Sequence, residues 1–422
     1  YLFCLYVSCF RIQAYPRLVT SQILFNFALV MENEMKKRLC VVTSTRADWG
    51  LLSPVCRALR DRGLLRIDIV ATNMHLIERY GNTYREIEAD GFDIACRVPT
   101  DVGSDDDASR ALVMAKTMEG MTKAFDSLRP DAVLLLGDRY EMLAVASAAA
   151  VMHIPVIHIA GGEVTVGALD DAFRHAITKL SSLHLSATED YRRRVLQLGE
   201  QPDTVINTGA IGVWNAFNTA LMPVSQLSES IGFDVTKGPL AVVTYHPATN
   251  DVVAPEARLG QFLDALDRYP SLRLVVTAPN NDAGGERLLA MLEDYVSARH
   301  NRAVFVRSLG MVRYHSLLRC ASLVIGNSSS GIVEVPSAGI PTVDVGIRQQ
   351  GRISAPSVIH CAEDTDSVAE AIAKALSPEM QALAAERVNP YFKPDTCALM
   401  VEAVEAFMSR LPLPPKHFYD LK

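Results

Sequence analysis

Short runs of Val, Leu and Ile alternate with amphipathic stretches along most of the chain, and this alternation constrains the fold more than any other feature. The apolar runs show little polar alternation, which is typical of parallel strands buried on both faces. Amphipathic stretches such as Ala108–Leu128, Ala168–Leu180 and Leu259–Tyr269 lie between the runs and predict helices. Strands that alternate with helices indicate doubly wound α/β domains. The predicted strands are Leu39–Val42, Ile67–Ala71, Ala132–Leu136, Val156–Ile159, Leu183–Leu185, Thr204–Asn207, Leu240–Thr244, Leu272–Thr277, Ala303–Val306, Leu323–Ile325 and Thr342–Val345.

A less regular stretch from Asn215 to Gly238 separates two groups of predicted strands. We therefore predict two Rossmann-like domains, over residues 35–214 and 215–395, and a final helix over Asp395–Ser409. In such a pair, the carboxyl ends of the strands would face each other across one cleft, where open α/β sheets bind ligands.

The first residues, 1–34, are apolar and aromatic but are interrupted by Arg11, Pro16 and Arg17. They lack the cationic start and small-residue cleavage site of a signal peptide, and they contain no run of about 18 uninterrupted apolar residues. We expect residues 1–34 to be an extension outside the fold. A membrane-associating anchor is the alternative, but we expect no membrane partner.

Charge and composition exclude several classes of function. The 422 residues carry a formal net charge of −7 with a pI near 5.8, which argues against nucleic acid as a partner. An anionic ligand must then be held by local groups. The eight cysteines form no CxxC pair, and no Cys/His cluster has zinc-ligand spacing. We therefore expect free thiols in a reducing compartment, the cytoplasm, and no metal site.

A small-residue string, Gly326–Gly331, follows one predicted strand and should open a helix. Small residues let a backbone approach a ligand closely, and free N–H groups at a helix start attract phosphate. Glu334 in the first turn would repel a phosphate, but its carboxylate can accept hydrogen bonds from two ribose hydroxyls. For this string alone, a capped turn without a ligand is an equally good interpretation.

Carboxylates follow buried strands in the first half of the chain. The candidates are Asp138 with Arg139, Glu163, and Asp171 with His175 four residues further along one predicted helix. A single loop carboxylate is usually only solvated. Several at neighbouring strand ends offer acid–base pairs, because burial and like charge separate their pKa values.

Further candidates are polar groups that also follow predicted strands. They are Arg46 and Arg348 for a diphosphate, His246 as a phosphate donor or proton carrier, His75, and Asn280 for the nucleotide. For each of these alone, a solvated or structural role is the commoner case. No GxGxxG string follows the first strand, so the sequence does not predict a tightly held nicotinamide cofactor.

As an ordered set, these strings resemble the hydrolysing UDP-N-acetylglucosamine 2-epimerases, the family that begins sialic-acid synthesis in bacteria and animals. Each string alone is weak, whereas the ordered set is highly specific and extends from about Lys37 to the end of the chain. The matching strings are Thr45-Arg46-Ala47-Asp48, Tyr80-Gly81-Asn82-Thr83-Tyr84, Gly137-Asp138-Arg139, Gly161-Gly162-Glu163, Asp170-Asp171 with Arg174-His175-Ala176-Ile177-Thr178-Lys179, His246-Pro247, Gly326-Asn327-Ser328-Ser329 with Gly331 and Glu334, Gly346 with Arg348-Gln349, and Asn389-Pro390-Tyr391-Phe392.

The resemblance implies a fold of the glycosyltransferase-B type, with a catalytic N-terminal domain, a UDP-binding C-terminal domain, and a C-terminal helix over 396–420 that returns to the first domain. The candidate catalytic and sugar-supporting residues are then Asp138, Glu163, Asp171, His75, His175 and Arg139. The candidate UDP-binding residues are Arg46, His246, Asn280, Asn327, Ser328, Ser329, Gly331, Glu334 and Arg348.

The implied reaction converts UDP-N-acetylglucosamine and water to N-acetylmannosamine and UDP, by elimination to a glucal and hydration. It requires neither a cofactor nor a metal, its partner is a UDP-amino sugar, and we expect a homo-oligomer. Leu136 and Ala160 stand where animal members carry polar groups, which leaves the exact sugar open. The alternatives are the same reaction on a UDP-2,4-diacetamido-2,4,6-trideoxy sugar, a glycosyltransferase on this fold, and a non-catalytic nucleotide-sugar sensor.

Overall fold

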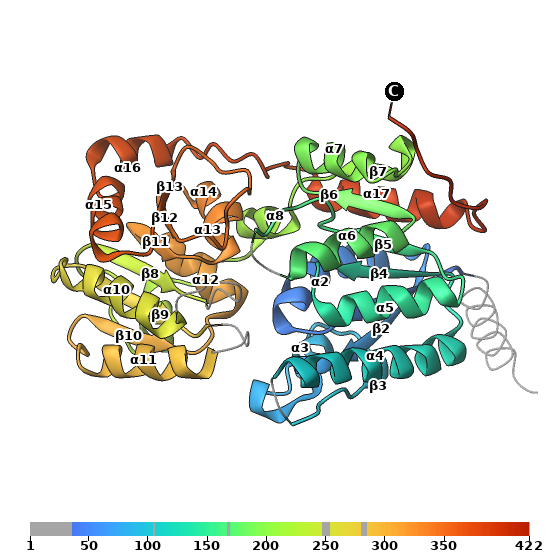
Figure 1. Ribbon diagram of the computed structural model, residues 1–422, viewed down its shortest axis with the longest axis horizontal. Coiled ribbons are helices and arrows are strands. Elements are labelled where there is room, and N and C mark those ends of the chain that lie inside the picture. The colour runs from blue at the N-terminus through green and yellow to red at the C-terminus, as the bar shows by residue number, and fades with distance from the viewer. Residues whose placement is uncertain (1–35, 104–105, 167–168, 247–253, 280–284, 422) are drawn as a thin grey trace, which may run out of the picture.

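The chain forms two parallel β-sheets, each with helices on both faces (Figure 1). The computed structural model describes residues 36–103, 106–166, 169–246, 254–279 and 285–421, so the predicted extension over 1–34 lies outside the described residues. The predicted α/β class with two Rossmann-like halves is confirmed.

The first sheet has seven strands, all paired in parallel. Its strand order is β3 (Ile94–Val98), β2 (Arg66–Thr72), β1 (Arg38–Thr43), β4 (Ala132–Leu136), β5 (Val156–Ile159), β6 (Leu183–Ser186) and β7 (Val205–Asn207). The helices of this half are α2 (Arg46–Arg62), the 3₁₀ turns η1 (Asn73–Leu76), η2 (Glu78–Tyr80) and η3 (Pro202–Thr204), α3 (Tyr84–Ala89), α4 (Asp107–Leu128), α5 (Tyr140–Val151), α6 (Asp170–Leu180), α7 (Glu189–Gln197) and α8 (Ile211–Asn218).

The central strand β1 shows why its sequence is continuously apolar. Leu39 and Val41 are buried in the core layer that contains residues of α2, whereas Cys40 and Val42 are buried in the layer of α4 and α5. Successive side chains of a strand point to opposite faces, so helices on both faces require apolar residues at every position.

The second sheet has six strands, again all parallel. Its order is β10 (Ala303–Val306), β9 (Arg273–Thr277), β8 (Leu240–Thr244), β11 (Leu323–Gly326), β12 (Thr342–Val345) and β13 (Val358–Cys361). The remaining helices are α9 (Val224–Ile231), α10 (Pro255–Asp267), α11 (Gly285–Ser297), α12 (Gly310–Leu318), α13 (Ser329–Val333), α14 (Val335–Ala338), α15 (Thr365–Ala375), α16 (Pro378–Ala385) and α17 (Thr396–Ser409).

The C-terminal helix α17 returns to the first half, as the resemblance implied, but it ends at Ser409 and not at residue 420. Met400, Val404 and Phe407 are buried in the same core cluster as Leu52 and Leu59 of α2. In Figure 1 this helix lies in the right-hand lobe, next to the first sheet. The last segment of the chain therefore helps to cover the sheet that carries the candidate carboxylates.

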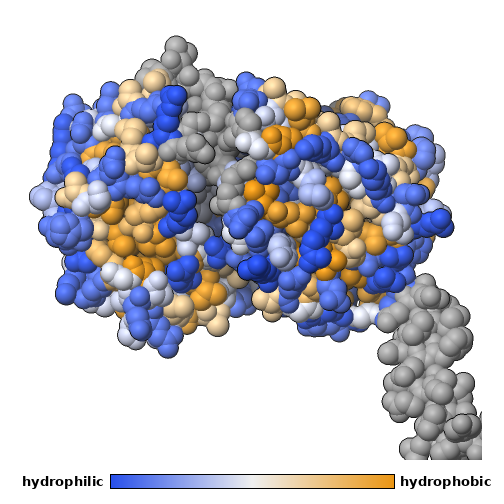
Figure 2. Space-filling model, turned by 90° about the horizontal axis from the view of Figure 1, so that it is seen from below, coloured by the Kyte–Doolittle hydropathy of each residue, from blue (hydrophilic) through white to orange (hydrophobic). Residues whose placement is uncertain are grey.

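Two strands differ from the sequence prediction, which did not include β3 or β13. The predicted division between residues 214 and 215 falls within α8, and it stays a prediction. The stretch from Asn215 to Gly238, expected to be irregular, contains the helix α9. On the face seen from below, both lobes mix polar and apolar residues (Figure 2).

Candidate functional site

One guanidinium group holds two of the candidate carboxylates. Arg174 lies in the second turn of α6, and only 1% of its side chain is exposed. Its Nη1 donates to Oδ1 of Asp171 at 3.1 Å, and its Nη2 donates to Oδ2 of Asp138. Nη2 also donates to Oγ1 of Thr165 at 2.8 Å. The structure thus brings Asp138 and Asp171 together around one buried positive charge.

The backbone and the charges around Asp138 favour its ionised form. Gly137, with φ 88°, turns the chain after β4 and is followed at once by Asp138. Burial opposes ionisation, but the guanidinium groups of Arg174 and Arg352 lower the pKa of Asp138 below its ordinary value. Asp138 is therefore a carboxylate near neutral pH and can accept a proton.

His175 lies one turn beyond Asp171 on α6. Its Nε2 is 3.6 Å from Oδ2 of Asp171, which is too long for a hydrogen bond. Burial lowers the pKa of His175, so its ring is neutral near pH 7. Its Nδ1 is buried and has no hydrogen-bond partner among the described residues. A neutral imidazole beside a carboxylate can bind a hydroxyl or an amide of a ligand.

Glu163 makes a contact that joins the two halves of the chain. It follows β5 through Gly161 and Gly162, and 12% of its side chain is exposed. Its Oε2 lies 2.9 Å from Nη1 of Arg352, which comes from the segment between β12 and β13. Nη2 of Arg352 donates at 3.3 Å to Oγ1 of Thr165, the hydroxyl that also binds Arg174. A side chain of the second half therefore belongs to the carboxylate cluster of the first half.

Arg139 is paired with a carboxylate that the sequence analysis did not single out. Its Nε donates to Oε1 of Glu141 at 2.7 Å, and the negative charge of Glu141 raises the pKa of Arg139. The hydroxyl of Ser44 lies within 2.9 Å of Glu141 and 2.8 Å of Asp48, although it has only one hydrogen to donate. Burial raises the pKa of Asp48, which fits a proton retained between these carboxylates.

His75 is completely buried below the end of β1. Its Nε2 is hydrogen-bonded to Oγ1 of Thr43 at 3.0 Å, and its Nδ1 to Oγ1 of Thr83 at 2.9 Å. Burial lowers the pKa of His75 to about 4, so the ring is neutral. Both ring nitrogens are engaged by the protein, which favours a role in orienting Thr43 and Thr83.

In the second half, Asn327 connects three strand ends. Its Oδ1 accepts from the backbone N–H of His246 at 2.7 Å, and its Nδ2 donates to the His246 carbonyl at 2.9 Å. The Asn327 carbonyl accepts from Nη1 of Arg348 at 3.2 Å and from Nε2 of Gln349 at 2.8 Å. Burial, with the nearby charge of Arg348, lowers the pKa of His246 well below its ordinary value. The structure therefore groups His246, Asn327 and Arg348.

The small-residue string adopts the geometry that its composition suggested. Gly326 has a φ of 140°, and a Cβ at this position would overlap the carbonyl of Thr244 on β8. Ser328 is the N-cap of α13, Ser329 is exposed, and a Cβ on Gly331 would press on Thr342 at 2.8 Å. The backbone can pass this close to β8 and β12 only without these side-chain atoms.

Glu334, between α13 and α14, has an unusually high pKa for a carboxyl group. Its side chain is 19% exposed, and the nearest basic nitrogen, Nε2 of His315, is 3.9 Å away. Burial raises the pKa of Glu334 to about 7. A Cβ on Gly212 in α8 would lie 2.9 Å from Oε1 of Glu334, so this carboxyl group faces the first half of the chain.

Arg46 makes a second contact between the halves. Its Nη1 donates to Oγ of Ser308 at 2.6 Å, and its Nε lies 2.8 Å from Oε1 of Glu86. Arg46, the first residue of α2, thus reaches the segment before α12. Asn280, the remaining candidate, lies outside the described residues.

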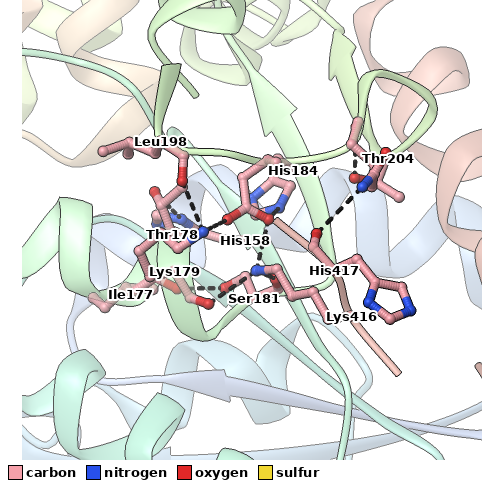
Figure 3. A network of polar contacts seen from close by, with 12 residues as sticks. His158, Ile177, Thr178, Lys179, Ser181, His184, Leu198, Thr204, Lys416 and His417 are labelled. Atoms are coloured by element: carbon pink, nitrogen blue, oxygen red, sulfur yellow. Dashed lines mark hydrogen bonds and ion pairs between the residues drawn. The ribbon is translucent and has the colours of Figure 1, made fainter. Parts of the chain in front are cut away.

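A buried polar network lies at the C-terminal end of α6 (Figure 3). The carboxylate of Glu200 is 1% exposed and is bonded by Nζ of Lys179 at 2.6 Å, Nε2 of His184 at 3.0 Å and Nζ of Lys416 at 2.6 Å. Next to it, Nε2 of His158 bonds the carbonyl of Gly137 at 2.8 Å. Because burial lowers the pKa of His158 to about 3, the neutral ring must carry its hydrogen on Nε2 to donate to that carbonyl.

A cavity of about 520 Å³ lies beside the segment that carries Arg352. Arg258, His360 and Glu363 also line it, and Oη of Tyr245 donates to Glu363 at 2.9 Å. Within the described part of the chain, its lining contains none of the site residues that the sequence predicted.

Two structural findings concern metals and membranes. Among the described residues, no three or more His, Cys, Asp or Glu side chains are grouped so that they could hold a metal ion. None of the helices in the described ranges combines the length and the apolar character needed to cross a bilayer.

The sequence analysis missed the roles of Arg352, Glu141 and Thr165. Arg352 carried a usable signal, since it follows Gly351 in the same loop as Arg348. Glu141 and Thr165 carried none, because a helix-start carboxylate and a loop hydroxyl are common on any α/β protein.

Comparison with known proteins identifies close relatives of the chain. Residues 57–405 match a family model described as UDP-N-acetylglucosamine 2-epimerase. The GDP/UDP-N,N'-diacetylbacillosamine 2-epimerase (hydrolyzing) of Campylobacter jejuni is 37% identical over 324 residues, which cover 77% of this chain and 84% of that protein. The UDP-N,N'-diacetylbacillosamine 2-epimerase (hydrolyzing) of Legionella pneumophila is 34% identical over 343 residues, covering 81% and 90%.

The fold also matches solved structures. The crystal structure of the UDP-GlcNAc 2-epimerase from Neisseria meningitidis bound to UDP-GlcNAc superposes with a TM-score of 0.75. The match covers 87% of this chain and 99% of that one, with 19% sequence identity. At this identity the likeness shows the arrangement of the two sheets and nothing finer.

Proposed function

Because the chain belongs to the UDP-N-acetylglucosamine 2-epimerase family, on its hydrolysing branch, we propose that it releases UDP from a UDP-activated 2-acetamido sugar and inverts carbon 2 of that sugar. The observation that carries the proposal is the contact between Glu163 and Arg352. It joins the carboxylates at one sheet edge to the loop of Arg348 at the other.

The chemistry explains why carboxylates and a phosphate-binding loop are needed together. The C2 hydrogen of a pyranose is not acidic, because no carbonyl group lies beside it. When the C1–O bond breaks and UDP leaves, C1 gains oxocarbenium character and the C2 hydrogen becomes acidic. A carboxylate takes that proton and a C1=C2 double bond forms. Water then adds its oxygen to C1, and a proton is delivered to C2 from the opposite face, which gives the free 2-epimer.

The second half would stabilise the leaving diphosphate. We place the diphosphate at the start of α13, where backbone N–H groups and the hydroxyl groups of Ser328 and Ser329 can donate hydrogen bonds. Arg348 and Arg46 would supply positive charge to it, and the backbone of His246 is hydrogen-bonded to Asn327 beside Arg348. Fixed donors of this kind stabilise negative charge on the leaving group.

In the first half, Asp138, Glu163 and Asp171 would exchange the protons. Arg174 is the common counter-ion of Asp138 and Asp171, and its charge helps to lower the pKa of Asp138. The neutral ring of His175 would bind a sugar hydroxyl or the acetamido group. Contact between the two halves excludes water, which strengthens these interactions and protects the glycal.

The sugar we propose first is UDP-N,N'-diacetylbacillosamine, a UDP-2,4-diacetamido-2,4,6-trideoxy sugar. Two relatives at 37% and 34% identity carry this activity in their names. This sugar has a methyl group at C6 where N-acetylglucosamine has a hydroxymethyl group. The half-buried apolar residues Leu136 and Ala160, next to the carboxylates, suit this less polar sugar. UDP-N-acetylglucosamine, which the sequence analysis placed first, is the second candidate.

The decisive experiment offers both UDP-sugars to the purified protein without an acceptor sugar. We expect UDP and the free 2-epimer in equal amounts, with a higher kcat/KM for the diacetamido sugar. NMR in D₂O should show one deuterium at C2 of the product. A folded protein that releases UDP only when an acceptor sugar is present would instead be a glycosyltransferase.

A further inference from the structure

The strongest feature not yet given a role is Arg352. It lies in the same loop as Arg348, four residues further along the chain, and its side chain is only 9% exposed. Its Nη1 and Nη2 contact Glu163 at 2.9 Å and Thr165 at 3.3 Å, and both partners belong to the first half. Its Nε is buried without a hydrogen-bond partner among the described residues. Burying a guanidinium group in this way is costly unless its charge is used.

The backbone around Arg352 is fastened to the first half by several independent contacts. The N–H of Ile353 donates to Oη of Tyr191 at 3.3 Å. The carbonyl of Ile353 accepts at 2.9 Å from Oη of Tyr391, which is itself hydrogen-bonded to Oη of Tyr191 at 2.8 Å. On the other side, a Cβ on Gly351 would touch Val164 at 3.1 Å. Arg352 therefore has little freedom to leave Glu163, because the residues before and after it are also held.

The charges around the carboxylates show what Arg352 supplies. Asp138, Glu163 and Asp171 face one guanidinium of their own half, that of Arg174. Arg139 is paired with Glu141, and its charge also helps to lower the pKa of Asp138. Arg352 adds a positive charge from the second half, and it is one of the causes that lower the pKa of Asp138.

We infer that Arg352 is a positioning residue for the proposed reaction: from the nucleotide-binding loop, it holds Glu163 in place and brings a positive charge of the second half to the carboxylate cluster. The inference rests on the proposed function and deepens it. One loop then carries both charges that the reaction needs, with Arg348 near the leaving diphosphate and Arg352 at the acid–base groups. The protonation of Asp138 then depends on the docking of this loop against the first half.

Other ionisable groups also face this cluster and must be considered in any pH profile. Arg139 follows β4, His175 lies on α6, Tyr191 and Arg194 come from α7, Tyr391 precedes α17, and Asp344 and His360 lie on β12 and β13 beside Arg352. The charge of Arg352 also acts to lower the pKa values of Tyr191, Asp344 and Tyr391, so the pH profile is interpreted together with the titration of Asp138 itself.

The test compares Arg352→Met with Arg352→Lys. In Arg352→Met we expect the acidic limb of the kcat/KM profile to move up by about one pH unit, because the carboxylates lose an opposite charge. Activity should therefore fall more at about pH 4.5 than at about pH 8. Arg352→Lys keeps the positive charge but loses the planar, two-pronged guanidinium group that contacts Glu163 and Thr165. The acidic limb should therefore return to its position in the unsubstituted protein, while kcat stays lower. The control Arg268→Met removes an arginine paired with Asp366 at 2.7 Å, on the surface of the second half, and should leave the profile unchanged.

Binding of UDP separates positioning from direct contact with the nucleotide. By calorimetry, Arg352→Met should bind UDP within about twofold of the unsubstituted protein. A loss of UDP affinity in parallel with kcat would overturn the inference and make Arg352 a phosphate ligand. An unmoved acidic limb would overturn it as well.

A measurement without turnover keeps the inference testable if neither sugar reacts, which would contradict the proposed function alone. Carboxyl groups of Asp and Glu labelled with ¹³C can be titrated by NMR, with the Asp138 signal assigned from Asp138→Asn. We expect this signal to titrate about one pH unit higher in Arg352→Met. An identical titration in both proteins would refute the role of Arg352, whatever the substrate.

Discussion

The ammonium nitrogen of Lys416 lies 2.6 Å from Oε2 of Glu200 and ties the end of the chain to the first half (Figure 3). The same nitrogen donates to the carbonyl oxygens of Lys179 at 2.9 Å and Ser181 at 2.6 Å, at the C-terminal end of α6. A cation at this end of a helix satisfies free carbonyl groups and the helix dipole. Because the opposite end of α6 carries Asp171, the C-terminal segment stabilises the helix that presents a candidate catalytic group.

Lys416→Met should lower the free energy of unfolding by about 1–3 kcal/mol at pH 7, because a buried carboxylate loses one of its three partners. Although burial opposes it, bonds from His184, Lys179 and Lys416 lower the pKa of Glu200 to about 2. This stabilisation is complete above the ordinary pKa of Glu and is lost as the pH falls toward 2. The difference between the two proteins should therefore narrow below about pH 4.5.

Urea unfolding at several pH values measures this effect. The matched control is Lys237→Met, since Lys237 is 71% exposed and pairs with Asp234 on the surface at 3.3 Å. Exposed pairs of this kind contribute about 0–1 kcal/mol. Equal losses in both variants would show that Lys416 acts as an ordinary surface charge.

Glu334→Gln should weaken UDP binding and yet stabilise the free protein at alkaline pH. Burial raises the pKa of Glu334 to about 7, above its value in the unfolded chain. The folded protein then binds the extra proton between about pH 4.5 and 7, so its stability falls as the pH rises through this window. The Gln variant lacks this penalty, and its midpoint of thermal unfolding should exceed that of the unsubstituted protein at pH 8 but not at pH 4.5.

Calorimetric titration with UDP checks the functional part. If the ionised carboxylate accepts hydrogen bonds from the ribose, UDP affinity should rise with pH through about 7 in the unsubstituted protein and stay flat and at least tenfold lower in Glu334→Gln. Glu293→Gln, which alters an exposed pair with Arg307, serves as the control. A Gln variant with unchanged affinity would exclude a ribose contact.

The sequence analysis failed to predict two strands, and both lie at sheet edges. Both unpredicted strands, β3 and β13, are edge strands and include half-exposed or exposed residues such as Arg97 and His360. An edge strand has only one neighbour and less cover, so its sequence need not be apolar throughout. The predicted inner strands were long apolar runs because helices cover both of their faces, and this is why the class of fold could be predicted.

For the candidate site, the sequence could predict which residues follow strands but not which partners they meet. Asp138 and Asp171 are brought together by Arg174, as their positions at one sheet edge suggested. The contact between Glu163 and Arg352 spans 189 positions of the chain, and no local pattern encodes it. Which of the candidates act on substrate stays a prediction.

Gly326→Ala should destabilise the protein by more than about 2 kcal/mol and abolish UDP binding. At φ 140° an L-residue is strained, and the added Cβ would overlap the Thr244 carbonyl, so β11 and the small-residue loop must shift. Gly260→Ala is the matched control, because Gly260 lies within α10 with no atom near its missing Cβ. That substitution should be stabilising by about 0.5–1 kcal/mol. Thermal unfolding with and without UDP compares the stability and the UDP binding of the two variants. Similar changes in stability at both glycines would refute the steric argument.

Asp138→Asn should stop the reaction before the glycal forms, since Asp138 is held as a carboxylate by Arg174 and is the candidate best prepared to take the C2 proton. Loss of a general base lowers kcat by about 10²–10⁴-fold. In D₂O the variant should return unreacted substrate without deuterium, whereas Glu163→Gln should release UDP and accumulate the glycal if Glu163 delivers the second proton. The control Asp126→Asn changes an exposed carboxylate on α4 and should react normally. If Asp138→Asn accumulated the glycal and Glu163→Gln did not, the two roles would be exchanged, because the residue needed only after UDP has left cannot be the one that removes the first proton.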